Sequence, residues 1–546
     1  MAPRNLSRRF VGPIALMFSI LFLYWPMLSA AEIAVFEPLE PISGSLVIHG
    51  GGSLSDSVLE GFVKLAGGAE ARIVVIPTAI EKDDAIEEAK EIAPFIKRGA
   101  AGAVMLHTRS RGKADEAAFC ECLKTATGVW FGGGQQSNLE KVYVGTRVET
   151  ALHELLKRGG VIGGTSAGAA AMSRVMIRSG NPKAEVGRGF GFLPGVVIDQ
   201  HFIKRDRAER LKTVLSDHAG LAGLGIDEGT ALIVRGRQMG VLGDSTVSVC
   251  FAASVNRPLR VENLKHGEMY DLVALRRAAI ARAGTAFPPN VLPSPEVDGK
   301  GTLVIDGGGL PAEALLRFIK AAGGADALIA VIPTAQGDDP PAQPGEARLL
   351  RKAGATNLKI IHARNPAEAN AAQLLAVLKE AKGIWFCGGR QWRLVDSFLD
   401  TPAEKLMHDV LARGGAIGGS SAGATIQAEY LVRGNPLGNR EMMFEGYERG
   451  MGFLKGVAID QHFTQRNRFA DMTLLKQAFP QLVGLGIDEN AALIVTGHVM
   501  EVVGTTNVNV YDRTGPAAPG QADYEVIKPG EKYDFKTRQR LEAARP

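Results

Sequence analysis

The sequence predicts an α/β fold, with two tandem three-layer domains that contain mainly parallel sheets. Three observations support this prediction: most of the chain is duplicated once, short β-branched runs alternate with amphipathic stretches in each copy, and glycine clusters follow those runs. Alternating strands and helices are typical of parallel sheets joined by right-handed crossovers. The loops at the carboxyl ends of such strands hold the ligand, so we expect the functional residues at the glycine clusters.

The duplication is visible in five pairs of motifs that occur in the same order in both halves. GVWFGGGQQ from Gly128 matches GIWFCGGRQ from Gly383, an offset of 255 residues, and GLGIDEGTALIV from Gly223 matches GLGIDENAALIV from Gly484, an offset of 261. The other pairs are LVIHGGG with LVIDGGG, VVIPTA with AVIPTA, and VVIDQHF with VAIDQHF. A repeat of this length is a whole domain rather than a short-period solenoid unit.

The motif pairs and the composition between them set the expected domain boundaries. We expect the first domain at residues 44–283 and the second at residues 301–535. The segment at residues 284–300 is rich in proline, which sustains neither a helix nor a central strand, so we expect a semi-rigid linker there. Its prolines are Pro288, Pro289, Pro293 and Pro295.

The composition is that of a globular protein with a large core. The chain has 546 residues, of which 46% are hydrophobic and 22% charged, and it exceeds the roughly 100–200 residues of one ordinary domain. The formal charge of +4 is small and includes Arg4, Arg8 and Arg9 near the N-terminus. Nucleic-acid binding normally shows as a clustered basic face, so we expect no nucleic-acid partner.

The first 31 residues are predicted to be a secretory signal. Basic residues extend to Arg9, an uncharged and mostly apolar run covers residues 10–28, and the small residues Ser29, Ala30 and Ala31 close it. An uncleaved signal anchor is the alternative, because about 18 residues is also the lower limit of a membrane span. We favour cleavage, expect an exported protein in the periplasm or the medium, and then expect no stable membrane insertion.

The cysteine and histidine patterns predict neither a metal site nor a cofactor. The chain has four cysteines, and no Cys/His cluster has the spacing of a zinc site. Two of them lie too close in sequence to bridge each other comfortably, so buried or free thiols are favoured over disulfides. The four are Cys120, Cys122, Cys250 and Cys387.

Two copies of the pattern G-x-S-x-G place a serine on a sharp turn between a strand and a helix. The first copy centres on Ser166 and the second on Ser421, each flanked by glycine and alanine. Small flanking residues let the backbone turn sharply and raise the serine to where a base and a substrate reach it. A turn without catalysis is the alternative that the pentapeptide alone leaves open.

Each serine is followed by a histidine and then by an acidic pair, which are the residue types of a nucleophile, a base and an orienting carboxylate. His201 and His462 end the two copies of DQH, and Glu228 and Glu489 end the two copies of GIDE. In the first copy Asp227 precedes Glu228, and neighbouring side chains of a strand point to opposite faces. One of the two orients the histidine, and the periodicity does not say which.

These motifs together resemble the cyanophycinases of serine peptidase family S51. The resemblance is carried by GGTSAGA, by DQHF followed by arginines, by GIDE, and by FGGGQQ and VIPTA, and it spans nearly all of both repeats. It implies a sheet like that of class I glutamine amidotransferases. The order Ser, His, Glu also differs from the order in α/β-hydrolases, where the histidine comes last.

The resemblance implies roles for individual residues. The implied nucleophile, base and orienting carboxylate are Ser166, His201 and Glu228 in the first copy, and Ser421, His462 and Glu489 in the second. Backbone N–H groups at Gly133, Gly134 and Ala167 would stabilise the oxyanion. Arginines that face aspartate carboxylates, and glutamines that touch the substrate main chain, are also implied. They are Arg205, Arg207, Arg210, Arg466, Arg468, Gln136 and Gln391.

The second copy departs from the pattern around its serine. Asp471 replaces the third arginine, Arg390 and Cys387 replace Gln135 and Gly132, and the loop between serine and histidine is six residues longer. An anion in place of a cation is expected to weaken a pocket for carboxylates. We therefore expect the first copy to act on cyanophycin and the second to be a lesser, altered or polymer-holding site.

Two further functions stay open at this stage. One is an S51 aspartyl dipeptidase that acts on short peptides, and the other is a chain in which one copy binds polymer without turnover. The enzymes that this chain resembles generally work as homodimers of single domains. The duplication therefore suggests an intrachain pseudo-dimer with an isologous-like interface.

Overall fold

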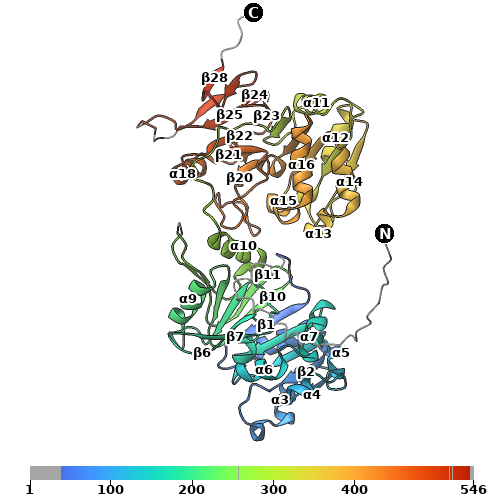
Figure 1. Ribbon diagram of the computed structural model, residues 1–546, viewed down its shortest axis with the longest axis vertical. Coiled ribbons are helices and arrows are strands. Elements are labelled where there is room, and N and C mark those ends of the chain that lie inside the picture. The colour runs from blue at the N-terminus through green and yellow to red at the C-terminus, as the bar shows by residue number, and fades with distance from the viewer. Residues whose placement is uncertain (1–38, 256, 514, 516, 519, 542–546) are drawn as a thin grey trace, which may run out of the picture.

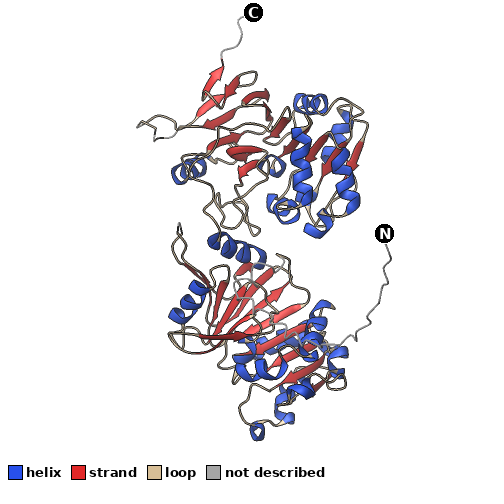
Figure 2. Cartoon of the chain, viewed as in Figure 1, coloured by secondary structure: helices blue, strands red, loops and turns tan. Residues whose placement is uncertain are grey.

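The computed structural model describes residues 39–541 except 256, 514, 516 and 519, and these residues form two α/β domains in sequence order (Figure 1, Figure 2). The predicted signal at residues 1–31 lies outside the described residues. Within the described part of the chain no helix is both long and apolar enough to cross a membrane. The four cysteines are all free thiols.

The main sheet of domain 1 has eight strands in the order β14-β11-β10-β1-β5-β4-β2-β3. Five strands pair in parallel, namely β1 (Ser45–His49), β2 (Arg72–Ile76), β3 (Gly102–Met105), β4 (Gly128–Phe131) and β5 (Val161–Thr165). Three more extend the sheet in antiparallel pairs, namely β10 (Thr230–Arg235), β11 (Gln238–Gly243) and β14 (Met269–Asp271).

A second sheet and a hairpin complete domain 1. The second sheet consists of β8 (Val196–Gln200), β9 (Ala222–Ile226), β12 (Val247–Phe251) and β13 (Arg260–Leu264), and only β8 and β9 pair in parallel. The hairpin is formed by β6 (Val175–Ser179) and β7 (Glu185–Arg188). The expected fold class is confirmed, but the sheets are mixed rather than mainly parallel. After β9 the connections are too short for a crossover helix, so most of the remaining strands pair antiparallel.

Helices cover both faces of the main sheet and make the three layers. The helices of domain 1 are α2 (Asp56–Leu65), α3 (Glu88–Ile96), α4 (Arg111–Ala114), α5 (Glu121–Thr125), α6 (Gln136–Tyr143), α7 (Arg147–Lys157), α8 (Ala167–Ala170), α9 (Ala208–Asp217) and α10 (Leu272–Ala283). Of these, α9 packs on β8 and β9 of the second sheet. Strand residues alternate between two cores, as a period of two requires. Val47 of β1 packs in one core with Phe62 and Trp130, and its neighbour Ile48 packs in the other core with Phe131.

Domain 2 repeats this architecture, with a nine-stranded and a five-stranded sheet. The nine-stranded sheet contains β15 (Thr302–Asp306), β16 (Ile329–Ile332), β17 (Leu358–Ile360), β18 (Gly383–Phe386), β19 (Ala416–Ser420), β23 (Ala491–Thr496), β24 (Val499–Gly504), β27 (Lys532–Asp534) and β28 (Gln539–Leu541). The five-stranded sheet contains β20 (Ala428–Tyr430), β21 (Leu454–Gln461), β22 (Val483–Ile487), β25 (Val508–Tyr511) and β26 (Glu525–Ile527). Strand β28 lies beyond the expected domain end at residue 535.

The helices of domain 2 follow the same order as those of domain 1. They are α11 (Ala312–Ala321), α12 (Gly345–Lys352), α13 (Pro366–Ala369), α14 (Ala372–Glu380), α15 (Gln391–Phe398), α16 (Pro402–Ala412), α17 (Ala422–Thr425) and α18 (Phe469–Ala478). The proline-rich linker separates α10 from β15 without forming a helix or a strand of its own. Its one β-bridge joins Val297 to Leu454 of domain 2.

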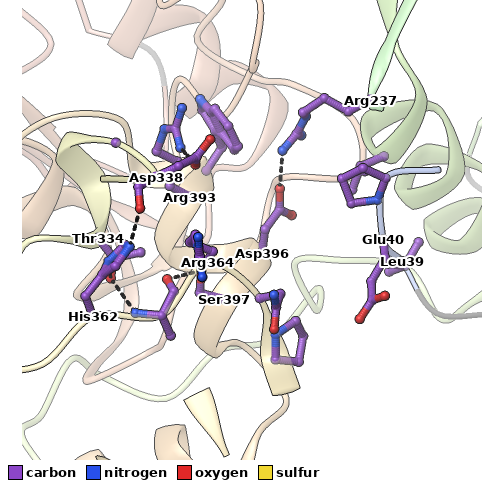
Figure 3. A pocket seen from close by; sticks show the side chains of 17 residues that line it. Leu39, Glu40, Arg237, Thr334, Asp338, His362, Arg364, Arg393, Asp396 and Ser397 are labelled. Carbon is purple, nitrogen blue, oxygen red and sulfur yellow. Dashed lines mark hydrogen bonds and ion pairs between the residues drawn. The ribbon is translucent and has the colours of Figure 1, made fainter. Parts of the chain in front are cut away.

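The two domains contact each other through arginines of domain 1 and acids of domain 2. Glu445, in the longer loop of domain 2, pairs with Arg257, Arg260 and Arg282. Asp396 pairs with Arg237 and Arg277 of domain 1 in the same way. Figure 3 shows the Arg237–Asp396 pair in a cavity of about 370 Å³ lined by both domains.

These contacts join surfaces that are not equivalent in the two repeats. By the motif offsets, Arg237 corresponds to His498 and Asp396 corresponds to Lys141. An isologous interface would use the same patch on both partners. The contacts therefore differ from the isologous pairing that the duplication suggested. Glu445 lies in a loop that is longer only in domain 2, and Asp396 stands where domain 1 has Lys141.

Candidate active site

The glycine-rich end of β1 holds together the three loops that carry the predicted triad of domain 1. Ser166 follows β5 of the main sheet, whereas His201 and Glu228 follow β8 and β9 of the second sheet. The expected carboxyl ends of strands thus belong to two sheets, whose ends meet here. The joining backbone hydrogen bonds are Ser166 N to His49 O (3.0 Å), His201 N to Gly50 O (2.7 Å) and Gly229 N to Gly51 O (2.9 Å).

The three side chains lie in hydrogen-bonding sequence. Ser166 Oγ is 2.8 Å from His201 Nε2, and His201 Nδ1 is 2.6 Å from Glu228 Oε1. With the Nδ1 proton donated to Glu228, Nε2 is free to accept the serine proton. A Cβ at Gly51 would lie 2.3 Å from His201 Cε1, so only glycine allows the imidazole to sit this close to β1.

Ser166 has the backbone geometry of a strained nucleophile turn. Its φ of 50° and ψ of −107° are unusual for a residue with a side chain. Such conformations are disfavoured by about 1–3 kcal/mol and persist only when the surrounding structure holds them. Here the hydrogen bond to β1 and the small residues of α8 hold the serine above the end of the strand.

Asp227 and Glu228 have separate roles in the structure. Glu228 contacts His201, whereas Asp227 Oδ1 accepts the N–H groups of Ile203 (3.1 Å) and Lys204 (3.0 Å). Burial raises the pKa of Asp227, but the Lys204 N–H and the Ser245 hydroxyl outweigh burial and hold this pKa below its usual value. Asp227 thus anchors the loop after His201, and the choice that the sequence left open falls on Glu228.

The base itself is tuned toward its neutral form. Burial lowers the pKa of His201, the Glu228 carboxylate opposes that effect, and the nearby Arg205 and Arg207 lower the pKa further. A neutral imidazole is the form that accepts a proton from serine. Arg205 and Arg207 therefore have two effects: they lower the pKa of the base, and they line the pocket.

Two backbone N–H groups without an acceptor lie next to Ser166. A Cβ at Gly133 would lie 3.6 Å from Ser166 Cβ, so the Gly133–Gly134 turn borders the serine. Within the described part of the chain, neither the Gly133 N–H nor the Ala167 N–H has a protein acceptor. Free N–H groups at such a position can stabilise a developing oxyanion.

A cavity of about 470 Å³ adjoins Ser166, and four arginines line it. Arg210 is buried and forms a two-pronged pair with Asp199, with 2.7 Å from Nε to Oδ2, and Arg207 also binds Gln200. Arg205 is exposed, and its guanidinium has no partner among the described residues. Of the three arginines implied by the resemblance, Arg205 is the one free to receive a substrate carboxylate.

Gln136 lines the same cavity but uses its amide group for the fold. Its Nε2 donates to the carbonyls of Ile177 (2.7 Å) and Arg178 (2.8 Å) and so fastens β6 beside the serine. Gln391 of domain 2 does the same with Val432 and Arg433. Their expected contact with the substrate main chain stays a prediction, and it would have to use the amide oxygen.

Replacing Arg205 with methionine should move the acidic limb of the pH profile to higher pH. Its charge disfavours protonated His201, so its removal raises the pKa of His201, and less neutral base remains at low pH. The measurement is the pH dependence of the labelling of Ser166 by a fluorophosphonate in a Ser421→Ala background. Arg205→Lys keeps the charge and should leave the limb in place; an unmoved limb in Arg205→Met contradicts the expectation.

Domain 2 contains a second triad with the same connections. Ser421 Oγ is 3.0 Å from His462 Nε2, and His462 Nδ1 is 2.7 Å from Glu489 Oε1. Ser421 has a φ of 53°, close to that of Ser166. Burial and then Arg466 lower the pKa of His462, as in the first site. The three side chains needed for serine chemistry are therefore assembled twice.

The Asp471 substitution does not place a free anion in the second pocket. Asp471 pairs with Arg433 at 2.7 Å, and Arg433 also binds Asp460, the counterpart of Asp199. Arg433 corresponds to Arg178, which also lines the first pocket, so the matching residues of domain 2 still include one arginine fewer. Asp471 is therefore paired with a charge from 38 residues upstream, and the expected weakening of the second pocket stays a prediction.

The longer loop of domain 2 is hydrogen-bonded to a residue beside the second site. Arg390, which replaces Gln135, donates to the carbonyls of Asn435 (2.6 Å) and Gly438 (2.6 Å) of that loop. The same loop carries Glu445 to the domain interface. The surroundings of the second serine therefore differ from those of the first, because Arg390 is bound to a loop that domain 1 lacks in this length.

Sequence reasoning missed two residues that matter at both sites. Asp199 is fully buried and pairs with Arg210. It could have been found in the sequence, because both copies of the DQHF motif contain this aspartate. Below the triad, His49 of domain 1 is replaced by Asp306 in domain 2, a difference visible between LVIHGGG and LVIDGGG. Burial and then the charge of His201 lower the pKa of His49 to about 4, whereas burial raises the pKa of Asp306 to about 6.

One family model and several curated cyanophycinases match the sequence of this chain. The family model described as peptidase family S51 matches residues 42–242 and again residues 305–503. The cyanophycinase of Geminocystis herdmanii is 31% identical over 238 residues, which are 39% of this chain and 87% of that protein. The cyanophycinase of Thermosynechococcus vestitus is 31% identical over 227 residues, which are 41% of this chain and 70% of that protein.

Two solved structures with some likeness carry the word peptidase in their descriptions. A peptidase from an acI-B1 Actinobacterium has 22% identity and a TM-score of 0.35, and the match covers 44% of this chain and 99% of that one. A putative peptidase E from Listeria monocytogenes EGD-e has 14% identity and a TM-score of 0.30 and covers 38% and 100%. The assignment rests on the repeated family match: the chain belongs to peptidase family S51 and is a serine-type peptidase with two copies of the family domain.

Proposed function

We propose that the chain is an exported serine exopeptidase that hydrolyses cyanophycin, a poly-aspartate with arginine side chains, to β-Asp-Arg dipeptides. The observation that carries this proposal is the arginine-lined cavity beside Ser166, with Arg205 free to bind a carboxylate. The cyanophycinases with about 31% identity support the same substrate class. The acidic backbone of the polymer is what a guanidinium fork recognises.

The proposed mechanism passes through an acyl-enzyme. Ser166 Oγ attacks the scissile carbonyl while its proton passes to His201 Nε2, and Glu228 stabilises the imidazolium. The N–H groups of Gly133 and Ala167 hold the oxyanion. On collapse the C–N bond breaks and His201 returns its proton to the leaving amine. Water then attacks the acyl-enzyme with His201 again as base, which releases the dipeptide and restores the serine.

The proposal also covers where the protein is located and what each of the two domains does. The signal-like composition of residues 1–31 supports export. The free Arg205 and the uncovered pocket support the first domain as the site of polymer cleavage. The attachment of Arg390 to the longer loop supports a lesser or polymer-holding role for the second domain.

The test is a digestion of insoluble cyanophycin by the purified chain, with products identified by mass spectrometry. Release of β-Asp-Arg dipeptides is the expected result. Poly-aspartate without arginine side chains and a set of aspartyl dipeptides serve as comparison substrates. Cleavage of the short peptides with no release from the polymer would favour an aspartyl dipeptidase and overturn the proposal.

A further inference from the structure

A carboxylate from α12 occupies the oxyanion side of the second serine site. Glu346 Oε1 accepts the Gly388 N–H at 3.0 Å, and Glu346 Oε2 lies 3.3 Å from Gln336 Nε2. A Cβ at Gly388 would lie 3.5 Å from Ser421 Cβ and 3.8 Å from Glu346 Oε1. The acid group, the glycine N–H and the nucleophile therefore share one small space.

Gly388 is the counterpart of Gly133, whose N–H is a donor of the proposed oxyanion hole. A backbone N–H carries one hydrogen, and here Glu346 uses it. The transition state of acylation places a negative oxygen where that hydrogen points, and an ionised carboxylate at the same place repels it. The second triad is complete, but one of its expected donors is occupied.

Domain 1 has a glutamate at the same position without this contact. Glu91 of α3 corresponds to Glu346 by the offset of 255 residues, and it lines a separate cavity of about 750 Å³ beside the Gly133 turn. Among the described residues, its carboxylate has no hydrogen-bond partner, and neither has the Gly133 N–H. Ile80 stands where domain 2 has Gln336, so domain 1 lacks the side chain that holds the second carboxylate oxygen.

We infer that Glu346, held by Gln336, occupies the oxyanion position of the second site and makes Ser421 slow to acylate although its triad is assembled. This inference rests on the serine chemistry of the proposed function and not on the identity of the substrate. Glu346 is thus a residue that decides which of the two serines turns over. Removing one oxyanion donor lowers rates by about 10²–10³-fold in serine peptidases, which sets the scale of the effect.

The experiment measures the labelling rate of Ser421 by a fluorophosphonate in a Ser166→Ala background. In this reaction Ser421 Oγ forms a bond to phosphorus, the P–F bond breaks, fluoride leaves and His462 takes the serine proton. Glu346→Ala should raise the rate by at least about tenfold, because the Gly388 N–H becomes free for the phosphoryl oxygen. Gln336→Ile introduces the residue that domain 1 has at this position and should also raise the labelling rate of Ser421. This variant replaces Glu346→Ala in the test if Glu346→Ala does not fold.

The matched control is Glu91→Ala in a Ser421→Ala background, where labelling of Ser166 should stay within about twofold because the Gly133 N–H is already free. Unchanged labelling of Ser421 in folded Glu346→Ala or Gln336→Ile protein overturns the inference. If Ser166 is labelled but the chain leaves cyanophycin intact, only the proposed substrate is contradicted. The two failures are therefore distinguishable.

Discussion

Ser166→Ala should reduce cyanophycin hydrolysis by about 10²-fold or more, because only the slower second site, with its occupied oxyanion donor, keeps a nucleophile. The reason in this molecule is the uncovered pocket, since Ser166 is the serine that adjoins Arg205 and free oxyanion donors. The measurement is the initial rate of dipeptide release from the insoluble polymer. Circular dichroism of the variant checks that the domain remains folded.

Ser421→Ala is the matched control and should retain most of the polymer activity. Its triad has the same geometry as that of Ser166, so it tests the pocket rather than the nucleophile. Equal partial losses in the two single variants would show two working sites and contradict this division. Full activity in the double variant would contradict serine chemistry altogether.

Asp199→Ala should destabilise domain 1 by about 3–5 kcal/mol, because it leaves buried positive charge without its partner. Asp199 is 0% exposed and Arg210 is 4% exposed, and their two-pronged pair joins β8 to α9. The measurement is denaturant unfolding followed by hydrogen exchange of each domain. The unfolding free energy of domain 2, which has its own Asp460 network, should not change.

Two further variants make the stability test specific. Asp199→Leu combined with Arg210→Met removes both charges and should recover much of the loss, since a buried ion pair replaced by apolar groups is often neutral. Asp244→Ala removes an exposed acid of the same domain and should stay within about 0.5 kcal/mol. A loss below about 1 kcal/mol for Asp199→Ala would mean that the pair does not hold the pocket wall.

The fold and the triads were predictable because their signals are local. Glycines at strand ends, a serine between small residues and a histidine after a β-branched strand each report on a few neighbouring residues. The structure places Ser166, His201 and Glu228 within hydrogen-bonding reach, as it does their counterparts in domain 2. The antiparallel extension of each sheet was missed because the crossover pattern was continued past its last helix.

The pocket was less predictable because charge pairing is not local. The R-x-R-x-x-R run predicts a substrate contact for Arg210, yet the charge of Arg210 is paired with that of Asp199, 11 residues upstream. Asp471 has the sequence position of a free pocket anion, yet Arg433, in the segment after β20, pairs with it. A side chain's partner depends on which strands the fold places together, and an arginine or aspartate in sequence does not reveal that.

The sequence by itself determined the duplication, the two nucleophile turns and the order of the triad residues, because each follows from short motifs whose backbone geometry is local. Only the tertiary structure decided which acid orients His201, which arginine stays free and which oxyanion N–H is occupied. Those outcomes depend on distances of about 3 Å between segments far apart in the chain, and such distances arise only after the sheets and helices pack.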